Sequence, residues 1–584
     1  MNQCPQPLIP IHDDPWRAMD HSARAQIALL TGGLSPASWS LALRDWWMHA
    51  LVAPGTQARL ALEATRLVTR SADRVAGTAG SPEGEGNRLG DSDPRLAGDD
   101  WQRWPWSLWR RNFLAFEHWC ELAVSSVPGV EAHHRHLVGY LTRQICEALS
   151  PANFLLTNPE LLEKTLRTGG TNLMTGLQNL QQDLLMAMAP KHGGPTSGDE
   201  RRRFRVGHEL AVTPGKVVFR NHLIELLQYS PTQAKVHAEP VLIVPAWIMK
   251  YYILDLSPAN SLVRYLVDQG FTVYCISWHN VGDDDSNVSL DDYRECGVMA
   301  ALDKVSALHP KAGVHATGYC LGGTLLSIAA ANMARVGDER LATVTLFAAQ
   351  TDFSEPGDLQ LFIDESQVSM LESVMHEQGT LSGGQMVAAF QLLQSRELIF
   401  NRMVHDYLLG ERAPLMDLVA WNADTTRMPY RMHTEYLRRL FLRNDLAAGH
   451  YEVDGRPISL RDLHLPLFLL GTERDQIAPW KSVFKLHQLC DSELTFVLTN
   501  GGHNAGVVSE PGHPRRHFRI ATTPAGALRS SPEDWLAATP VREGSWWEAW
   551  SAWLATHATG TLVAPPRAAA QTLGDAPGSY VLQT

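Results

Sequence analysis

The stretch Gly318-Tyr319-Cys320-Leu321-Gly322-Gly323 constrains the fold of this chain more than any other part of the sequence. An apolar run, Val314 to Thr317, precedes it, and an apolar helical pattern, Leu325 to Arg335, follows it. Small residues two before and two after a central nucleophile allow a strand to reverse sharply into a helix without side-chain collisions. The pattern therefore predicts a nucleophile elbow that presents Cys320 outward.

This expected elbow also predicts the chemistry of Cys320. The backbone N–H of Leu321 and the positive end of the following helix would point to where an oxyanion forms, and the same end favours a thiolate. A thiol that attacks a thioester exchanges one thioester for another at little free-energy cost, which favours acyl transfer over hydrolysis. The alternative is a chance motif around a small core cysteine. The flanking strand and helix make that alternative weaker.

Composition sets the general class of protein. A chain of 584 residues, with 45% apolar and 19% charged residues, is expected to form two or more globular domains. The net charge of −12 argues against nucleic acid as the main partner, because phosphate groups require a basic surface. Seven cysteines without a Cys-x-x-Cys pair favour a reducing cytoplasm. Neither an export signal nor a transmembrane segment is expected.

Changes of pattern along the chain predict three parts. Residues 1–92 form a variable N-terminal extension that ends in a Gly- and Ser-rich linker, and residues 93–205 form a helical, tryptophan-rich N-terminal domain. Within that domain, Asn158 before Pro159 predicts a helix start with proline at the first helical position. Residues 206–584 form the catalytic domain.

The catalytic domain alternates strand and helix patterns, which predicts an α/β fold with a mainly parallel sheet covered on both faces. The elbow makes this an α/β-hydrolase fold. Residues 353–449 show helical sequence without a strand signal, and we expect them to form a helical cap over the active-site face. The runs predicted as strands are Lys216–Phe219, Val241–Val244, Thr272–Ile276, Val314–Thr317, Thr343–Phe347, Leu467–Leu470 and Leu494–Leu498.

In this fold an acid and then a histidine follow the nucleophile, each in a loop after a later strand. Asp475 and His503 stand at these two places in the sequence. We expect Asp475 to hold the imidazole of His503 in the right tautomer, and His503 to take the proton of Cys320. Glu473, in the same loop as Asp475, is the alternative acid. Asp475 is preferred because its position beyond the glycine turn matches the expected acid loop.

A second oxyanion donor is expected in the loop after the strand that ends at Val244. This loop reads Pro245-Ala246-Trp247-Ile248-Met249, and the sequence does not distinguish which backbone N–H group donates. Ile248 is our candidate for the donor. The indole of Trp247 is equally expected to be a wall of the substrate pocket.

In the stretches around Cys320, Asp475 and His503, and in several others given at the end of this paragraph, the chain closely resembles the polyhydroxyalkanoate synthases. These are the polymerases that make bacterial polyester storage granules. The resemblance covers most of the chain beyond about residue 93. The chain departs from the family pattern at Met249, Gln476, Gly502 and Asn504, which bears on rate and substrate range more than on reaction class. The similar stretches include Ser150–Glu160, Thr213–Val218, Val244–Tyr265, Gly318–Gly323, Trp421–Thr426, Asp475–Trp480, Gly502–Val507 and Ala576–Val581.

The resemblance implies repeated transfer of (R)-3-hydroxyacyl units from a coenzyme A thioester to the growing chain's hydroxyl, with release of coenzyme A. It makes Cys320 the acylated residue and His503 the general base. Asp475 either orients the histidine or activates the 3-hydroxyl, and Trp421 serves dimer contact or substrate placement. The resemblance implies no cofactor and no metal. The implied partners are the acyl-coenzyme A substrate, the polyester granule and a second copy in a homodimer, at the granule surface in the cytoplasm.

Two other functions stay open from the sequence. A thioesterase or intracellular polyester depolymerase of the same fold needs the same nucleophilic attack, and only the helical N-terminal domain, with its segment Asn153 to Glu160, speaks against it. An inactive scaffold protein at the granule surface has no need of a catalytic triad.

Overall fold

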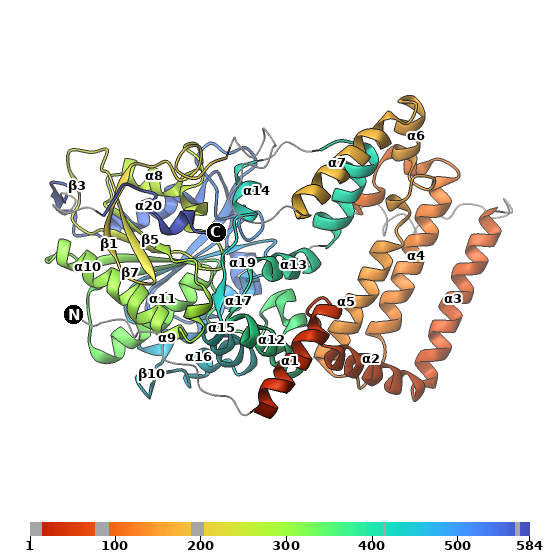
Figure 1. Ribbon diagram of the computed structural model, residues 1–584, viewed down its shortest axis with the longest axis horizontal. Coiled ribbons are helices and arrows are strands. Elements are labelled where there is room, and N and C mark those ends of the chain that lie inside the picture. The colour runs from red at the N-terminus through yellow and green to blue at the C-terminus, as the bar shows by residue number, and fades with distance from the viewer. Residues whose placement is uncertain (1–14, 76–92, 189–203, 394, 413–415, 567–572) are drawn as a thin grey trace. The chain divides into compact units, whose positions relative to one another are not determined.

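The computed structural model describes residues 15–75, 93–188, 204–393, 395–412, 416–566 and 573–584. The chain divides into two compact units, drawn in Figure 1. The first, here called the sheet unit, contains Met1–Leu34, Gly198–Val387 and Leu415–Thr584. The second, here called the helical unit, contains Ser35–Ser197 and Ala388–Pro414. The linker expected before residue 93 falls mostly on residues 76–92, outside the described residues.

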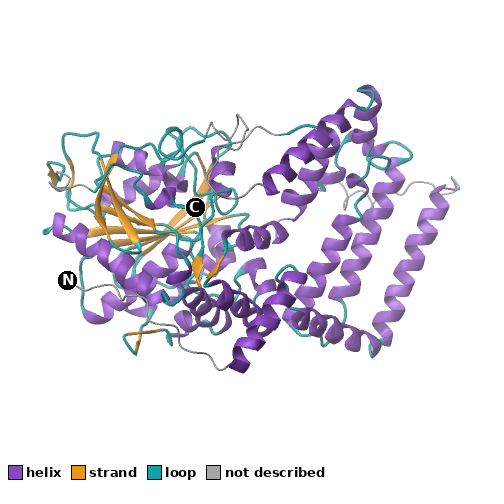
Figure 2. Cartoon of the chain, in the orientation of Figure 1, coloured by secondary structure: helices purple, strands orange, loops and turns teal. Residues whose placement is uncertain are grey.

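The described part of the helical unit contains helices and no strands (Figure 2). The start of α6 confirms the sequence prediction: the side chain of Asn158 accepts hydrogen bonds from two backbone N–H groups, and Pro159 is the first helical residue. The helices are α2 (Pro36–Leu51), α3 (Pro54–Val75), α4 (Trp106–Ser125), α5 (Ala132–Ala148), α6 (Pro159–Arg167), α7 (Thr171–Met188) and the π-helices η9 (Arg396–Asn401) and η10 (Met403–Leu409).

A ten-stranded sheet forms the centre of the sheet unit. Its six central strands run parallel, and antiparallel strands extend it at both edges. This arrangement confirms the predicted α/β fold with a mainly parallel sheet. In spatial order the strands are β1 (Gly215–Arg220), β2 (Ile224–Tyr229), β5 (Val273–Trp278), β4 (Val241–Val244), β6 (Val314–Tyr319), β7 (Leu341–Phe347), β12 (Leu467–Thr472), β13 (Leu494–Thr499), β14 (His517–Thr523) and β15 (Val541–Glu543).

Helices cover both faces of this sheet, as Figure 1 shows, and an apolar cluster fills each interface. Helices α10 (Ala300–Leu308) and α11 (Leu321–Val336) lie on one face, together with α17 (Trp480–Phe484), α18 (Leu486–Leu489) and α19 (Pro532–Ala538). Helices α8 (Leu262–Asp268) and α20 (Trp546–Thr556) lie on the other. Because both faces are covered, the central strands are buried along their whole length.

The sequence analysis missed strand β2, which lies between the edge strand β1 and β5, because Glu225 and Gln228 interrupt its apolar pattern. Both side chains are nevertheless buried. The carboxylate of Glu225 accepts hydrogen bonds from the backbone N–H groups of Ser579 (2.8 Å) and Tyr580 (2.9 Å), and it pairs with Arg220. These contacts stabilise a charge that would otherwise be costly to bury. A segment far away in the sequence therefore makes this strand possible.

The predicted cap region is mainly helical, with one exception. A two-residue strand pair joins β8 (Thr380–Leu381) to β9 (Met428–Pro429), so the expectation that this region contains no strand is wrong there. The region's segment 388–414 belongs to the helical unit. Besides η9 and η10, the helices described in the region are the 3₁₀ helix η8 (Gly357–Phe362), α12 (Glu365–Gln378), α13 (Gly383–Leu393), α14 (Asp417–Asn422), α15 (Tyr430–Glu435), the π-helix η11 (Tyr436–Leu442) and α16 (Asp445–Ala448).

Helix α1 (Pro15–Leu30) packs on α12 within the sheet unit. Ala25 and Ala28 form a small apolar cluster with Met370 and Val374. The first helix of the chain thus contributes to the sheet unit and not to the helical one. Of the helices described, none has both the length and the apolar character needed to cross a lipid bilayer.

Candidate active site

The structure contains the predicted strand–turn–helix elbow at Cys320. Strand β6 ends at Tyr319 and α11 begins at Leu321, so Cys320 alone makes the turn, with φ 52° and ψ −125°. This is a region that residues other than glycine rarely adopt. A Cβ atom on Gly318 would lie 2.3 Å from Cα of Gly323, and one on Gly322 would lie 2.2 Å from a backbone oxygen. The glycines are therefore needed for steric reasons.

Cys320 is a half-buried free thiol. Its backbone N–H donates to the carbonyl oxygen of Phe347 in β7 at 2.8 Å, which fixes the turn against the sheet. Leu321 is the first residue of α11, where N–H groups have no acceptor within the helix and carry partial positive charge. The predicted oxyanion donor thus lies next to the sulfur in the chain.

Of the other cysteines described, Cys120, Cys146, Cys275 and Cys490 are free thiols.

Asp475 and His503 come together as the sequence analysis predicts. They follow the parallel strands β12 and β13, and His503 Nδ1 lies 2.8 Å from Asp475 Oδ2. Asp475 also accepts hydrogen bonds from Thr472 Oγ1 at 3.1 Å and from the backbone N–H groups of Ile477 (2.9 Å) and Ala478 (2.8 Å). Because a carboxylate accepts and does not donate, it holds the proton of His503 on Nδ1.

The imidazole of His503 also interacts with the neighbouring side chain of Cys320. Burial of the ring lowers the pKa of His503, but Asp475 and the nearby Cys320 raise it more, so the net pKa lies well above its ordinary value. A protonated imidazole stabilises a negatively charged sulfur, which is the nucleophilic form of cysteine. The arrangement is suited to nucleophilic attack by Cys320.

Glu473, the alternative acid, does not meet His503. Its carboxylate lies 3.8 Å from His517 Nε2, and its side chain is 36% exposed. Of the two acids in this loop, only Asp475 contacts the histidine.

The loop that carries His503 is held by residues that the sequence analysis did not identify. Two indoles of α20 donate to its backbone: Trp546 Nε1 to Gly506 O and Trp547 Nε1 to Val507 O, both at 3.0 Å. From the elbow, Tyr319 Oη donates to Asn504 Oδ1 at 2.6 Å. The tryptophan-rich sequence of α20 was the available signal, but it carries no information on partners so far away in the chain.

The structure also locates the predicted residues of the second oxyanion loop. The side chain of Trp247 is buried, with its ring centroid 5.6 Å from that of Trp278 and 4.7 Å from that of Tyr293. It therefore packs as a core residue. Ile248 is half-buried in the same loop.

The segment Trp421–Thr426 binds three backbone carbonyl groups in or just after this loop. Trp421 Nε1 donates to Lys250 O at 2.8 Å, and the backbone N–H of Thr426 donates to Ile248 O at 3.3 Å. The hydroxyl of Thr426 donates to Trp247 O. Because each peptide group is planar, a fixed carbonyl also fixes the direction of the N–H on the other side of the same peptide. The hydroxyl of Thr426 thus fixes the direction of the Ile248 N–H, and Trp421 holds the chain just after this loop at Lys250.

Known sequences resemble this chain over most of its length. Residues 14–56 match the family described as "Poly-beta-hydroxybutyrate polymerase N terminal", and residues 92–266 match "Poly-beta-hydroxybutyrate polymerase (PhaC) N-terminus". Residues 239–509 match "alpha/beta hydrolase fold", and this range contains Cys320, Asp475 and His503.

Curated relatives carry one common description. A poly(3-hydroxyalkanoate) polymerase of Methylorubrum extorquens is 40% identical over 499 residues, which cover 84% of this chain and 80% of the relative. The poly(3-hydroxyalkanoate) polymerase subunit PhaC of Cupriavidus necator is 36% identical over 501 residues, which cover 84% of this chain and 83% of the relative. The similarity therefore spans both units.

Proposed function

Since the chain belongs to the poly(3-hydroxyalkanoate) polymerase family and is an acyltransferase, we propose that it polymerises (R)-3-hydroxyacyl units through a thioester on Cys320. The observation that carries the mechanism is the imidazole of His503, which Asp475 holds at 2.8 Å and which interacts with the elbow cysteine Cys320. From the family resemblance, the proposal includes an acyl-coenzyme A substrate and a homodimer at the polyester granule surface in the cytoplasm.

In the first half-reaction, the sulfur of Cys320 attacks the thioester carbonyl of the substrate, and its proton resides on His503. The oxyanion that forms faces the N–H of Leu321 and an N–H group of the loop that contains Ile248. The bond between the carbonyl carbon and the coenzyme A sulfur then breaks, and His503 returns the proton to the leaving thiolate. One thioester replaces another, so the acyl group stays activated.

In the second half-reaction, the 3-hydroxyl at the end of the growing chain attacks the carbonyl carbon bound to Cys320. His503 takes the hydroxyl proton, an ester bond forms, and the bond to Cys320 breaks, which regenerates the sulfur nucleophile. The same imidazole thus serves both half-reactions. It does so because the proton on its other nitrogen stays fixed.

For Asp475 the contacts favour the role of orienting the histidine. Its side chain is fully buried, and both its oxygens already accept hydrogen bonds, one from His503 and three from its own loop. A carboxylate so enclosed has no oxygen left for a substrate hydroxyl. It instead fixes the tautomer of His503 and stabilises the imidazolium.

The test measures coenzyme A release from (R)-3-hydroxybutyryl-coenzyme A and weighs insoluble product in the same tube. The native chain is expected to give both, and Cys320→Ala to give neither. Cys120→Ala, which removes a free thiol of the helical unit, is the matched control and is expected to keep the native rate.

Acylation of Cys320 itself is read by mass spectrometry of the peptide that contains it, after quenching in acid. A mass increase of one hydroxyacyl unit on that peptide supports the thioester. Coenzyme A release with free acid and no polymer would show that the protein acts as a thioesterase and not as a polymerase. Full activity of Cys320→Ala would refute the assigned nucleophile.

A further inference from the structure

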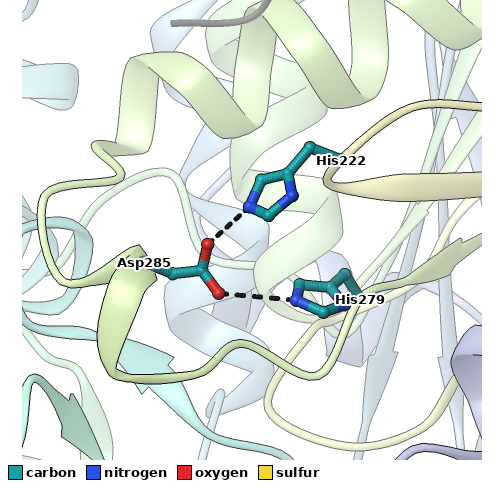
Figure 3. Close-up of side chains that lie close together, drawn as sticks. All are labelled: His222, His279 and Asp285. Atoms are coloured by element: carbon teal, nitrogen blue, oxygen red, sulfur yellow. Dashed lines mark hydrogen bonds and ion pairs between the residues drawn. The ribbon is translucent and has the colours of Figure 1, made fainter. Parts of the chain in front are cut away.

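Away from the triad, the sheet unit brings together a second group of imidazole and carboxylate side chains: His222, His279 and Asp285. Figure 3 shows the carboxylate of Asp285 between the two rings. One oxygen lies 2.5 Å from His222 Nε2, and the other lies 3.4 Å from His279 Nε2. Sequence reasoning missed this group and expected no metal, because its members come from three segments and form no motif.

The hydrogen bonds around His279 determine its tautomer. Its Nδ1 lies 2.9 Å from Gln583 Oε1, and that oxygen also accepts the backbone N–H of Asn280 at 2.8 Å. The second contact identifies the Gln583 atom as the amide oxygen, since a backbone N–H can only donate. Nδ1 of His279 must therefore carry the proton.

With its proton on Nδ1, a neutral His279 presents a lone pair at Nε2. This lone pair faces Asp285 Oδ2, which also only accepts. Two acceptors 3.4 Å apart repel each other unless a positive charge lies between them. A second proton on the ring or a metal cation supplies that charge.

The donor set fits a cation that binds imidazole and carboxylate. Bond lengths of about 2.0–2.2 Å to Zn²⁺ place two ligand atoms of one tetrahedral ion about 3.3 Å apart. His279 Nε2 and Asp285 Oδ2 lie 3.4 Å apart, and all three ligand atoms lie within 4.8 Å of one another. The side chain of His222 is 53% exposed, so its ring has room to turn toward the same ion.

The surroundings also suit a bound cation. The backbone N–H of Gly282 donates to Asp285 Oδ2 at 2.8 Å and so orients the carboxylate, as Gln583 orients His279. Such outer contacts are typical of metal ligands. The neighbouring Asp283 and Asp284 are exposed and add negative charge, while the exposed His222 leaves a path from solvent.

We propose that His222, His279 and Asp285 bind one divalent transition-metal cation of the Zn²⁺ class, with solvent completing its coordination. The ion ties the turn between β1 and β2 to the end of β5 and to the 3₁₀ turn Asp283–Asp285 (η6). Its role is structural, because the part of the chain described here places no nucleophile among its ligands.

The experiment measures Zn²⁺ binding to the untagged full chain in a Cys320→Ala background, so that the reactive thiol is not a ligand. Bound Zn²⁺ is counted by elemental analysis after dialysis, and affinity is measured by competition with a chromogenic indicator. His279→Ala and, at the half-exposed position, His222→Ala are compared with the parent. His464→Ala is the matched control, because this exposed histidine belongs to no such group among the described residues.

The parent is expected to bind one equivalent more than either cluster variant, and His464→Ala to bind as the parent does. Co²⁺ in this position is expected to show visible d–d absorption without the charge-transfer band of thiolate ligands. Equal Zn²⁺ binding in parent and cluster variants would overturn the proposal, and so would no binding by the parent. A thiolate band that Cys120→Ala abolishes would place the ion in the helical unit and also overturn it.

Discussion

In the triad around His503 and in the cluster around His279, an oxygen acceptor fixes the tautomer of a histidine, but the two sites are suited to different chemistry. In each, an oxygen acceptor holds the proton on Nδ1: Asp475 at 2.8 Å from His503, and Gln583 at 2.9 Å from His279. In each, Nε2 is left to face a third group. That group is the thiol of Cys320 in the triad, and the carboxylate of Asp285 in the cluster.

The difference shows that the tautomer alone does not define an imidazole's function. Against a thiol, a buried Nε2 exchanges a proton with a nucleophile. Against a carboxylate that a second, half-exposed histidine also contacts, it presents a lone pair to a cation. The group opposite Nε2 and the access of solvent decide between catalysis and binding.

The largest effect is expected when the acceptor of the triad is altered. Asp475→Asn keeps the shape but offers an amide N–H to Nδ1, which favours the wrong tautomer of His503. We expect kcat to fall on the order of 10³–10⁴-fold, as measured by coenzyme A release. Glu473→Gln, in the same loop, is the control and is expected to stay near the native rate. A variant that keeps a large part of native kcat would show that the tautomer is set elsewhere.

A histidine without a nearby acid gives the opposite sign of pKa shift. Burial alone lowers the pKa of His433 to about 4, whereas that of His503 is raised. Between pH of about 6.5 and 4 the unfolded chain protonates this residue and the folded chain does not, so His433 destabilises the fold as pH falls, by up to about 3 kcal/mol.

Urea unfolding of the native chain and of His433→Leu at pH 7 and pH 5 measures this difference. The loss of unfolding free energy on acidification should be smaller in the variant. The raised pKa of His503 acts the other way: its stabilisation is present below pH of about 6.5 and is lost as pH rises through the raised value. An equal loss in both chains would show that His433 titrates alike in the folded and unfolded states.

The outer contact of the cluster can be removed as well. Gln583→Ala deletes the oxygen that holds the proton of His279 on Nδ1, so Zn²⁺ affinity is expected to fall about 10–100-fold. Indicator competition measures it, with Gln233→Ala, an exposed glutamine of the same unit, as control. An unchanged Zn²⁺ affinity would show that Gln583 does not fix the tautomer of His279 as Asp475 fixes that of His503.

The smallest effect on kcat is expected from the loop that contains Ile248, which we propose supplies an N–H group to the oxyanion. The cluster around His279 has no counterpart of this loop among the described residues. Trp421→Phe removes the hydrogen bond to Lys250 O and keeps most of the ring. A lost neutral hydrogen bond costs on the order of 1 kcal/mol, so kcat should fall roughly 5-fold with KM nearly unchanged. The control is Trp535→Phe, a buried indole whose N–H has no hydrogen-bond partner among the described residues. A change in KM alone would assign Trp421 to substrate placement.

Local signals explain what could be predicted. The elbow is readable because glycines are required where Cβ atoms would collide, and strands β12 and β13 are readable from their mainly apolar sequences. Strand β2 was missed because the partners of its buried Glu225 lie in the chain near Ser579. Thr426 was missed because its partners are backbone carbonyls, which carry no mark in the sequence.

The sequence by itself determined the α/β architecture, the elbow at Cys320 and the loop positions of Asp475 and His503 after later strands, because apolar periodicity and glycine sterics act over a few residues. Only the tertiary structure decided that Asp475 and not Glu473 meets His503, and that Asp285 lies between two histidines. It also assigned residues 388–414 to the helical unit. These outcomes depend on side chains from distant segments meeting within hydrogen-bonding distance, which only the packing of the whole unit brings about.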